Sequence, residues 1–164
     1  MQTTPATQTY RLVLSTSIGD VREDAASGQK AFFAGRQFGA GEVLSSFVAE
    51  EVCVNPSYLT VQLGDKHHIM LKPAYLQYIN HSCNPNCFFD TTNLTVVALR
   101  DIAYDEELTF FYPSSEWDMS QPFVCNCRSQ QCLGMIRGAK HLSDQQANEY
   151  HLNLYIVDKR NLEG

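Results

Sequence analysis

The chain has 164 residues, of which 44% are hydrophobic and 18% are charged, and its formal net charge is −6. These values describe one globular domain with a core of its own and exclude a disordered chain. No apolar stretch approaches the roughly 20 residues of a membrane-spanning helix, and an acidic chain binds nucleic acid poorly. We therefore expect no membrane partner and no direct nucleic acid partner, while an acidic surface suits a basic one.

Residues 1–9 are polar and rich in threonine. They lack the apolar segment of a signal peptide, so they predict a flexible N-terminal tail. The absence of such a signal fits reduced thiols. We therefore expect an intracellular protein, either cytoplasmic or nuclear.

The next hundred residues predict many short strands. Residues 20–30 are polar and contain Gly28, so they predict a loop, and Pro73 begins a short helical piece. Runs of β-branched and aromatic residues between turn residues predict the strands. These runs lie at residues 11–14, 31–34, 43–48, 51–54, 60–63, 68–71, 94–99 and 108–111. The pattern predicts a mainly β (α+β) fold of several small sheets with short helices.

A Gly64-Asp65 turn joins the strands on either side of it into a predicted hairpin. Because side chains alternate along a strand, one of His67 and His68 should point inward and the other outward. Cys53 lies in an apolar strand, so we expect it to be a core residue.

Residues 78–86 read Tyr-Ile-Asn-His-Ser-Cys-Asn-Pro-Asn and carry the densest polar chemistry of the chain. Asn and Ser bond to the nearby backbone and Pro85 lacks an N–H, so the run predicts a rigid polar turn. Its flanks are apolar, so the Asn side chains would pair buried backbone groups. Taken alone, the run also fits an ordinary solvated turn.

Cys125, Cys127 and Cys132 form a C-x-C-x4-C run. A disulfide requires a particular separation of its Cβ atoms, so three thiols this close do not pair easily among themselves. They can converge on one structural zinc ion, which takes four such ligands. The candidates for the fourth ligand are Cys83, Cys87 and Cys53. Cys83 is the best placed because it lies in the polar turn, and Cys87 is more typical of a small buried residue.

The C-terminal residues predict a helix. Ser143 and Gln146 have the spacing of an N-terminal capping box. Apolar residues then recur at helical spacing, at Ala147, Tyr150, Leu154 and Val157. We expect one amphipathic helix from about Asp144, packed on the domain. A dimer contact is the alternative, so the chain is expected to be a monomer or a homodimer.

Three segments together resemble the SET-domain protein lysine methyltransferases. Residues 80–86 are similar to the NHSCxPN motif of that family, and residues 106–112 (Glu-Glu-Leu-Thr-Phe-Phe-Tyr) are similar to its second signature. The cysteines at 125, 127 and 132 are similar to its zinc-binding post-SET segment. The order and separations agree with the family over residues 28–138, and the pre-SET cysteine cluster of many histone enzymes is absent.

The resemblance implies a SET-type β-clip with a pseudoknot-like threading of the chain. It implies a minimal SET domain over residues 10–122 and a post-SET zinc-binding segment over residues 123–140. Residues 141–164 would then form the C-terminal amphipathic helix and tail.

The resemblance also implies an activity: transfer of methyl groups from S-adenosylmethionine to a lysine ε-amine of a protein, with S-adenosylhomocysteine as product. The substrate would be a lysine-containing protein or peptide, histone or non-histone, including a basic tail. Tyr112 occupies the position of the family's catalytic tyrosine. Phe110 and Phe111 would line the substrate channel. Such a displacement needs alignment in a narrow channel and no nucleophilic side chain or catalytic metal.

The remaining site residues follow from the same resemblance. The implied cofactor-binding residues are Lys30, Ala31, Phe32, Tyr78, Asn80 and His81. The implied ligands of one structural zinc are Cys83, Cys125, Cys127 and Cys132. The family's G-x-G cofactor loop is replaced here, since residues 29–31 read Gln-Lys-Ala, so contacts at this loop would use backbone groups.

Two other functions fit parts of the sequence. A catalytically weak SET-like module that binds a peptide or the cofactor is favoured by the altered glycine loop and opposed by the presence of Tyr112, Asn80 and His81. A secreted, disulfide-stabilised binding domain fits the even number of cysteines, six, but lacks a signal sequence. We take the methyltransferase as the leading hypothesis.

Overall fold

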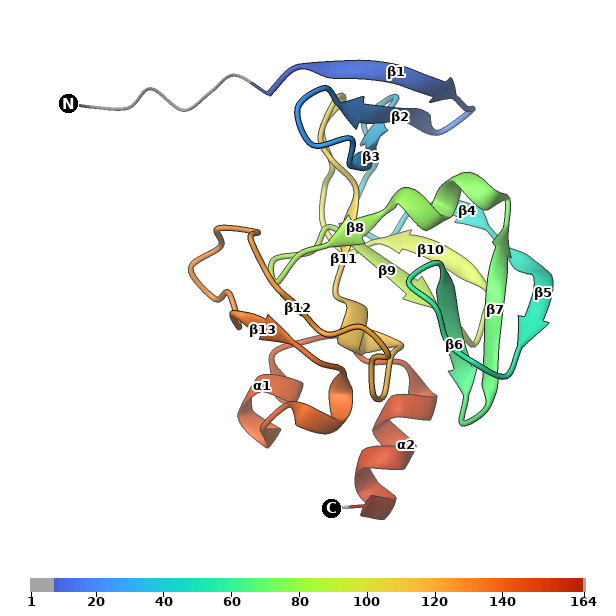
Figure 1. Ribbon diagram of the computed structural model, residues 1–164, viewed down its shortest axis with the longest axis vertical. Coiled ribbons are helices and arrows are strands. Elements are labelled where there is room, and N and C mark those ends of the chain that lie inside the picture. The colour runs from blue at the N-terminus through green and yellow to red at the C-terminus, as the bar shows by residue number, and fades with distance from the viewer. Residues whose placement is uncertain (1–7, 164) are drawn as a thin grey trace.

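The protein is described by a computed structural model that covers residues 8–163 (Figure 1). The predicted tail at 1–9 therefore lies mostly outside the described residues. The strands are β1 Tyr10–Ser15, β2 Gly19–Asp24, β3 Lys30–Ala34, β4 Val43–Ser46, β5 Val48–Cys53, β6 Thr60–Gly64, β7 His67–Lys72, β8 Asn80–His81, β9 Cys87–Asp90, β10 Thr95–Ala98, β11 Thr109–Phe110, β12 Phe123–Val124 and β13 Met135–Ile136. The helices are η1 Ala74–Tyr78, η2 Tyr112–Ser114 and η3 Ala139–His141, which are 3-10 turns, and α1 Asp144–Asn148 and α2 Leu154–Glu163.

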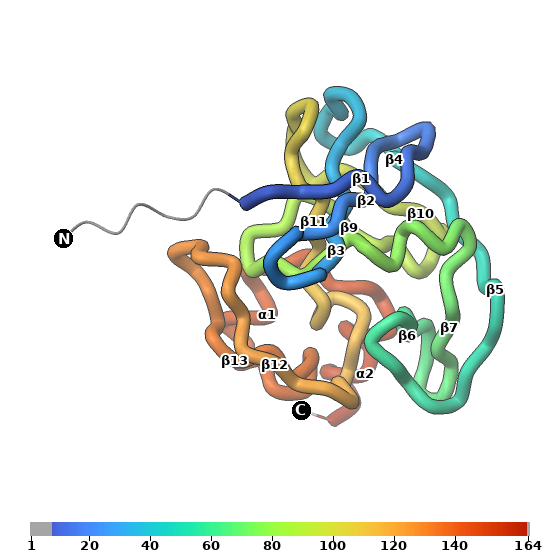
Figure 2. Tube along the Cα trace, turned by 45° about the horizontal axis from the view of Figure 1, so that its top comes forward, coloured from blue at the N-terminus to red at the C-terminus, as the bar shows by residue number. Residues whose placement is uncertain are grey.

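The strands form three small sheets and one two-stranded ribbon. Their orders are β1-β2-β3, β4-β10-β9-β11-β8, β5-β7-β6 and β12-β13. Both views place the β5-β7-β6 sheet and the β12-β13 ribbon on opposite sides of the chain that follows β11 (Figures 1 and 2). The mainly β prediction of several small sheets is confirmed.

The predicted loop at 20–30 is wrong in its first half, where β2 forms instead. β2 is mostly polar, and Val21 is fully buried opposite Phe32 of β3. A strand with a single inward apolar residue shows little alternation of apolar and polar residues, so the sequence did not indicate it. The loop itself is shorter, and Asp24 Oδ1 accepts backbone hydrogen bonds from Ala26 and Ser27 there.

The hairpin predicted around Gly64 is confirmed by the antiparallel pairing of β6 and β7. His68 is buried and His67 is exposed, as the alternation predicted. Cys53 was predicted in the core and this is wrong, because β5 is an edge strand of its sheet and the residue is partly exposed.

The chain threads through itself at the five-stranded sheet. β8 and β9 follow one another in sequence, yet β11 lies between them and runs parallel to both. The connecting residues 82–86 therefore pass around β11. Ser82 N donates to Phe110 O at 3.0 Å, and Asn86 N donates to Thr109 O at 3.2 Å. This threading brings the two sequence motifs at 80–86 and 106–112 side by side.

Two clusters of buried side chains form the core of the molecule. The larger lies between the sheets and includes Phe32, Phe38, Phe89, Ile102 and Leu108, all fully buried. The smaller has three buried members, Cys83, Cys125 and Ile136. The smaller cluster is where the C-terminal segment joins the rest of the chain.

The single C-terminal helix predicted from Asp144 is two helices, α1 and α2. The capping box is confirmed, because Gln146 N donates to Ser143 Oγ and Ser143 N donates to Gln146 Oε1. Asn153, the residue just before α2, is buried and binds segments outside the helices. Its Nδ2 donates to the carbonyls of Phe89 and Ser114, both at 2.9 Å. No helix in residues 8–163 has the length and apolar character needed to cross a membrane.

Candidate functional site

The two polar motifs meet in the five-stranded sheet. Thr109 pairs with Asn80, and Phe110 pairs with His81, in parallel register. The Asn86 side chain secures the far end of the turn: its Oδ1 accepts from Thr109 N at 2.8 Å, and its Nδ2 donates to Glu107 O at 2.8 Å. These hydrogen bonds hold the predicted turn at 78–86 in place, although Tyr78 ends η1 and Asn80–His81 form the short strand β8.

His81 connects the turn to Tyr112. The backbone N–H of Tyr112 donates to His81 Nδ1 at 3.2 Å. Nδ1 is thus the acceptor, so Nε2 carries the ring proton, and Nε2 lies 3.4 Å from Cys83 Sγ. Burial lowers the pKa of His81 to about 4, so the ring is neutral near pH 7. One neutral imidazole thus joins the polar turn, the tyrosine and a cysteine.

Asn80 connects the turn to β3. Its Nδ2 donates to Lys30 O at 2.9 Å and lies 3.3 Å from Glu107 Oε1. The Lys30 ammonium lies over the ring of Tyr78, 5.5 Å from its centroid. The side chains of Ala31 and Phe32 are buried in the core. Of the predicted cofactor-binding residues on β3, those two therefore have only backbone groups to offer.

Tyr112 is a neutral phenol in a desolvated position. Burial, with smaller contributions from the carboxylates of Glu107 and Glu116, raises its pKa to about 12. The hydroxyl therefore keeps its proton throughout the physiological range. Its ring packs against His81, with centroids 5.2 Å apart, and against Phe110 at 4.7 Å.

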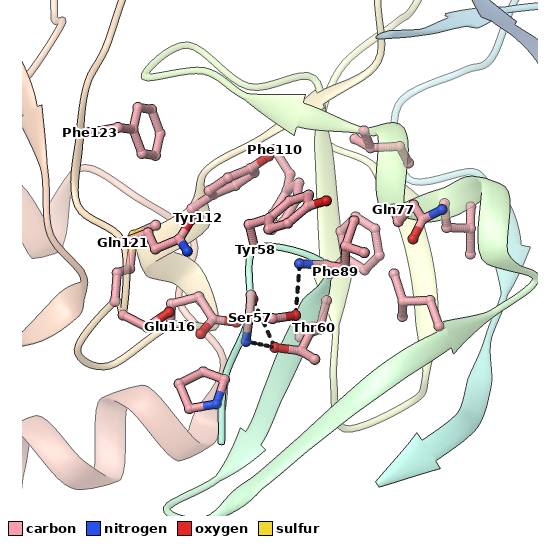
Figure 3. A pocket seen from close by; sticks show the side chains of 18 of the residues that line it. Ser57, Tyr58, Thr60, Gln77, Phe89, Phe110, Tyr112, Glu116, Gln121 and Phe123 are labelled. Atoms are coloured by element: carbon pink, nitrogen blue, oxygen red, sulfur yellow. Dashed lines mark hydrogen bonds between the residues drawn. The ribbon is translucent and has the colours of Figure 1, made fainter. Parts of the chain in front are cut away.

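A cavity of about 280 Å³ opens beside Tyr112 (Figure 3). It is walled by the segment before β6, by η1 and by the chain that follows β11, and its lining is mostly apolar. Phe110 and Tyr112 line it, whereas Phe111 does not. The Phe111 ring instead stacks on Tyr150, with centroids 3.6 Å apart and planes 7° apart.

Glu116 also lines this cavity, and the sequence analysis did not identify it. Its Oε1 accepts from Gln62 N at 2.9 Å, and Gln62 Oε1 accepts from Trp117 N at 2.8 Å. Burial raises the pKa of Glu116 to about 7. Glu116 and Gln62 are 54 residues apart and belong to no motif that we recognised, so no sequence signal pointed to the pair.

The four cysteines predicted to meet do lie together. The Sγ atoms of Cys83, Cys125, Cys127 and Cys132 all lie within 4.8 Å of one another. A Zn–S bond of about 2.3 Å in a tetrahedron separates neighbouring sulfurs by about 3.8 Å. The Cys83 and Cys125 sulfurs are 3.9 Å apart. Four thiols at this spacing fit zinc, and Cys87 lies apart from them in the main core.

The surroundings of Cys83 suit a metal-bound thiolate. Leu133 N lies 3.4 Å from Cys83 Sγ and donates to it. Tyr150 Oη and Gln131 Nε2 donate to the Cys83 carbonyl at 2.9 and 2.7 Å. Hydrogen bonds of this kind orient the ligands of metal sites.

Comparisons with known proteins identify a family whose signature motifs are the segments that meet at this site. The family model for the SET domain matches residues 29–113. "Methyltransferase flvH" of Aspergillus flavus is 40% identical over 121 residues, which is 73% of this chain and 67% of that protein.

Histone enzymes match over shorter stretches. The "Histone-lysine N-methyltransferase, H3 lysine-4 specific" of Aspergillus fumigatus is 40% identical over 37% of this chain, and the match spans 5% of that protein. "Histone-lysine N-methyltransferase ash1" of Drosophila melanogaster is 30% identical over 48% of this chain and 4% of that protein.

Among solved structures, KRYPTONITE in complex with mCHH DNA, an H3(1-15) peptide and SAH superposes with a TM-score of 0.53. The match has 20% sequence identity and covers 70% of this chain and 28% of that one. At this identity the similarity supports the fold of the chain.

Proposed function

This chain belongs to the SET-domain family, and from that premise we propose that it is an S-adenosylmethionine-dependent methyltransferase acting on a lysine ε-amine of a protein. One observation carries the proposal: Tyr112 touches the Asn80-His81 turn on one side and lines a mostly apolar cavity on the other. A hydroxyl in that position can lie between a methyl donor and an amine.

The donor would lie at the Asn80-His81 turn and β3. S-adenosylmethionine, when bound, supplies a methyl group on a cationic sulfur. A neutral His81 adds no repulsion to that cation, and the nearby Glu107 carboxylate favours it. Lys30, Ala31 and Phe32 would contribute mainly backbone groups, while Tyr78, Asn80 and His81 contribute the turn.

The amine would enter through the cavity. A lysine ammonium must lose its proton before it can attack, and desolvation beside a second cation lowers its pKa. The apolar wall supplies desolvation and holds the alkyl chain of lysine, with Phe110 as one side of the channel. Alignment of the amine then accounts for most of the acceleration.

Tyr112 would act as a fixed dipole. Its hydroxyl is held neutral by burial, so it can accept a hydrogen bond from the amine without taking its proton. A pre-oriented hydroxyl in a water-poor site contributes more than it would in water. We assign it the catalytic role on these grounds.

Cys83, Cys125, Cys127 and Cys132 would hold one structural zinc. With four protein ligands such a site is closed and takes no part in the reaction. Its part is to fix residues 123–140 against the turn that carries Cys83. We accordingly treat residues 10–122 as the SET domain, 123–140 as the post-SET segment and 141–164 as the C-terminal region.

The proposal extends to partners and location. The substrate is a lysine-containing protein or peptide, and the net charge of −6 favours a basic segment and disfavours direct contact with nucleic acid. An intracellular site of action, cytoplasmic or nuclear, follows from such substrates and from reduced thiols. The chain would act as a monomer or a homodimer.

The test is methyl transfer to mixed proteins. The zinc-loaded chain is incubated with trideuteromethyl-labelled donor and a heat-treated cell lysate, with purified histones in parallel, and labelled residues are mapped by mass spectrometry. We expect label on lysine, and far less label at the same time point with Tyr112→Phe. Donor binding without any labelled lysine would instead support the binding-module alternative.

A further inference from the structure

The cavity beside Tyr112 is lined mostly by apolar side chains, with a few polar groups and a carboxylate. Its walls come from apolar side chains such as Leu71, Leu76 and Phe89, and from the rings of Tyr58 and Phe110. Its lining includes hydroxyl and amide groups as well. Within the part of the chain that the structure describes, a single charged side chain borders it, that of Glu116.

Glu116 is presented to the cavity by a rigid support. Its backbone is fixed at both ends, because Glu116 N donates to Tyr112 O at 3.0 Å and Ala139 N donates to Glu116 O at 2.8 Å. Its Oε1 accepts from Gln62 N. Gln62 is itself held, since its Nε2 donates to Gly64 O at 3.0 Å. In Figure 3 Glu116 and Tyr112 border the same space, with Tyr58 facing them.

The second carboxylate oxygen of Glu116, Oε2, has no hydrogen-bond partner among residues 8–163, and it is not one of the fully enclosed polar atoms there. No ion pair among the same residues includes Glu116. Glu116 therefore borders a mostly apolar cavity and has one carboxylate oxygen without a partner among residues 8–163.

We propose that Glu116 binds the alkylammonium group of the substrate as it enters the cavity, and so selects a cationic amine over a neutral group of equal length. The inference rests on the proposed function, because it names the recognition element of the same site. The apolar walls would hold the methylene groups of the lysine side chain, and the Glu116 carboxylate would hold its charged end.

The electrostatics of Glu116 agree with this role. Burial raises its pKa to about 7, because desolvation disfavours the ionised carboxylate and only the bond from Gln62 N opposes this. An ammonium group beside it would supply that partner and restore the ionised form. The backbone N–H of Gln62 donates to Oε1, and no cationic side chain of residues 8–163 lines the cavity. A cationic ligand beside Glu116 would therefore be favoured electrostatically.

A purely structural role for Glu116 is the competing explanation. Glu116 Oε1 helps to join β6 to the chain after η2, because it accepts from Gln62 N, beside the bond from Trp117 N to Gln62 Oε1. Glu116→Gln separates the two roles, because the amide oxygen can still accept that bond while the negative charge is removed. Glu116→Asp keeps the charge on a shorter side chain.

The test measures binding of small probes in place of turnover. The full zinc-loaded chain is titrated at pH 8.5 with n-butylammonium chloride, which has the length and charge of a lysine side chain, and with 1-butanol. Binding is followed by ligand-observed NMR and by the fluorescence of Trp117, the one tryptophan of the sequence. Glu51→Gln, an exposed carboxylate on β5, is the matched control at constant ionic strength.

We expect the wild type and Glu51→Gln to bind butylammonium about 10-fold more tightly than butanol, as for a hydrogen bond to a charged group. Glu116→Gln should bind the two probes equally, and Glu116→Asp should retain part of the preference. A preference that survives in Glu116→Gln, or a wild type without preference, overturns the proposal. Absence of methyl transfer in the labelling experiment would instead overturn the proposed function.

Discussion

The two clusters of buried side chains are held together in different ways. The larger is a conventional apolar core, in which rings such as Phe32 and Phe89 are fully buried between small sheets. The smaller buries only Cys83, Cys125 and Ile136, and its other members are partly exposed. Three buried residues cannot offset the conformational entropy of the segment that they order. We therefore expect the larger cluster to stay folded by itself, and the smaller to need the zinc ion that its four cysteines could hold.

The largest expected effect is on the smaller cluster alone. Cys125→Ser, or removal of zinc by a chelator, should unfold residues 123–137 and leave the main core folded. Zinc contributes on the order of 10 kcal/mol to folding in small zinc domains. Hydrogen exchange measures both regions at once: we expect protection lost at β12 and β13 and kept at β9 and β10.

Cys53→Ser is the matched control, because this cysteine lies outside the cluster on β5. It should change neither region. Global unfolding of Cys125→Ser would contradict the independence of the two clusters.

Tyr112→Phe should reduce kcat by about 10²-fold to 10³-fold, the usual cost of removing one polar group that stabilises a transition state. The melting temperature and the affinity for S-adenosylhomocysteine should stay close to those of the wild type. Tyr104→Phe is the control, because Tyr104 is exposed. An unchanged kcat would remove the hydroxyl from the mechanism.

Asn153→Ala tests the join between the C-terminal helices and the main core. Asn153 Nδ2 donates to Phe89 O and Ser114 O, and its Oδ1 accepts from Thr91 N at 2.9 Å. Leaving buried groups unpaired should lower the free energy of unfolding by about 2–4 kcal/mol. Denaturant unfolding measures the change.

The exposed Asn148 offers the control substitution Asn148→Ala, which should cost less than about 0.5 kcal/mol. An equal decrease in the free energy of unfolding for the two variants would show that the hydrogen bonds of the Asn153 side chain do not stabilise the fold.

The smallest effect concerns pH. The folded pKa of Glu116 is raised to about 7, above its ordinary value of 4.5. The folded chain therefore holds a proton that the unfolded chain has lost, and stability falls as pH rises from about 4.5 through 7. We expect this group to contribute about 1–2 kcal/mol of that loss, less than the full shift would give, because the Glu116 side chain borders an open cavity. Urea unfolding across this range measures it.

Glu116→Gln should abolish that contribution, and Glu51→Gln should keep it. An identical pH slope in Glu116→Gln and the wild type would show that the carboxylate is ionised like an exposed one.

Sequence reasoning reached the parts of the molecule that local chemistry determines. The polar turn at 78–86, the capping box at Ser143 and the grouping of Cys125, Cys127 and Cys132 each follow from residue types at short spacing. Cys83 lies 42 residues before Cys125, and it was chosen for its place in that turn and from the family resemblance. It missed β2, whose single inward apolar residue is Val21, and the break before Asn153. It also missed the pair Glu116 and Gln62. The strand, the break and this pair all depend on contacts between segments that are distant in the sequence, and no local pattern records such contacts.

The central claim is that the zinc segment and the donor site form one unit through His81, which contacts Cys83, Tyr112 and the ring of Phe123. Calorimetric titration of S-adenosylhomocysteine into zinc-loaded and zinc-free chain tests it most directly. We predict at least about 10-fold weaker binding without zinc, since each 1.4 kcal/mol of coupling changes affinity tenfold. Equal affinity in a zinc-free chain that keeps its main core would contradict the account.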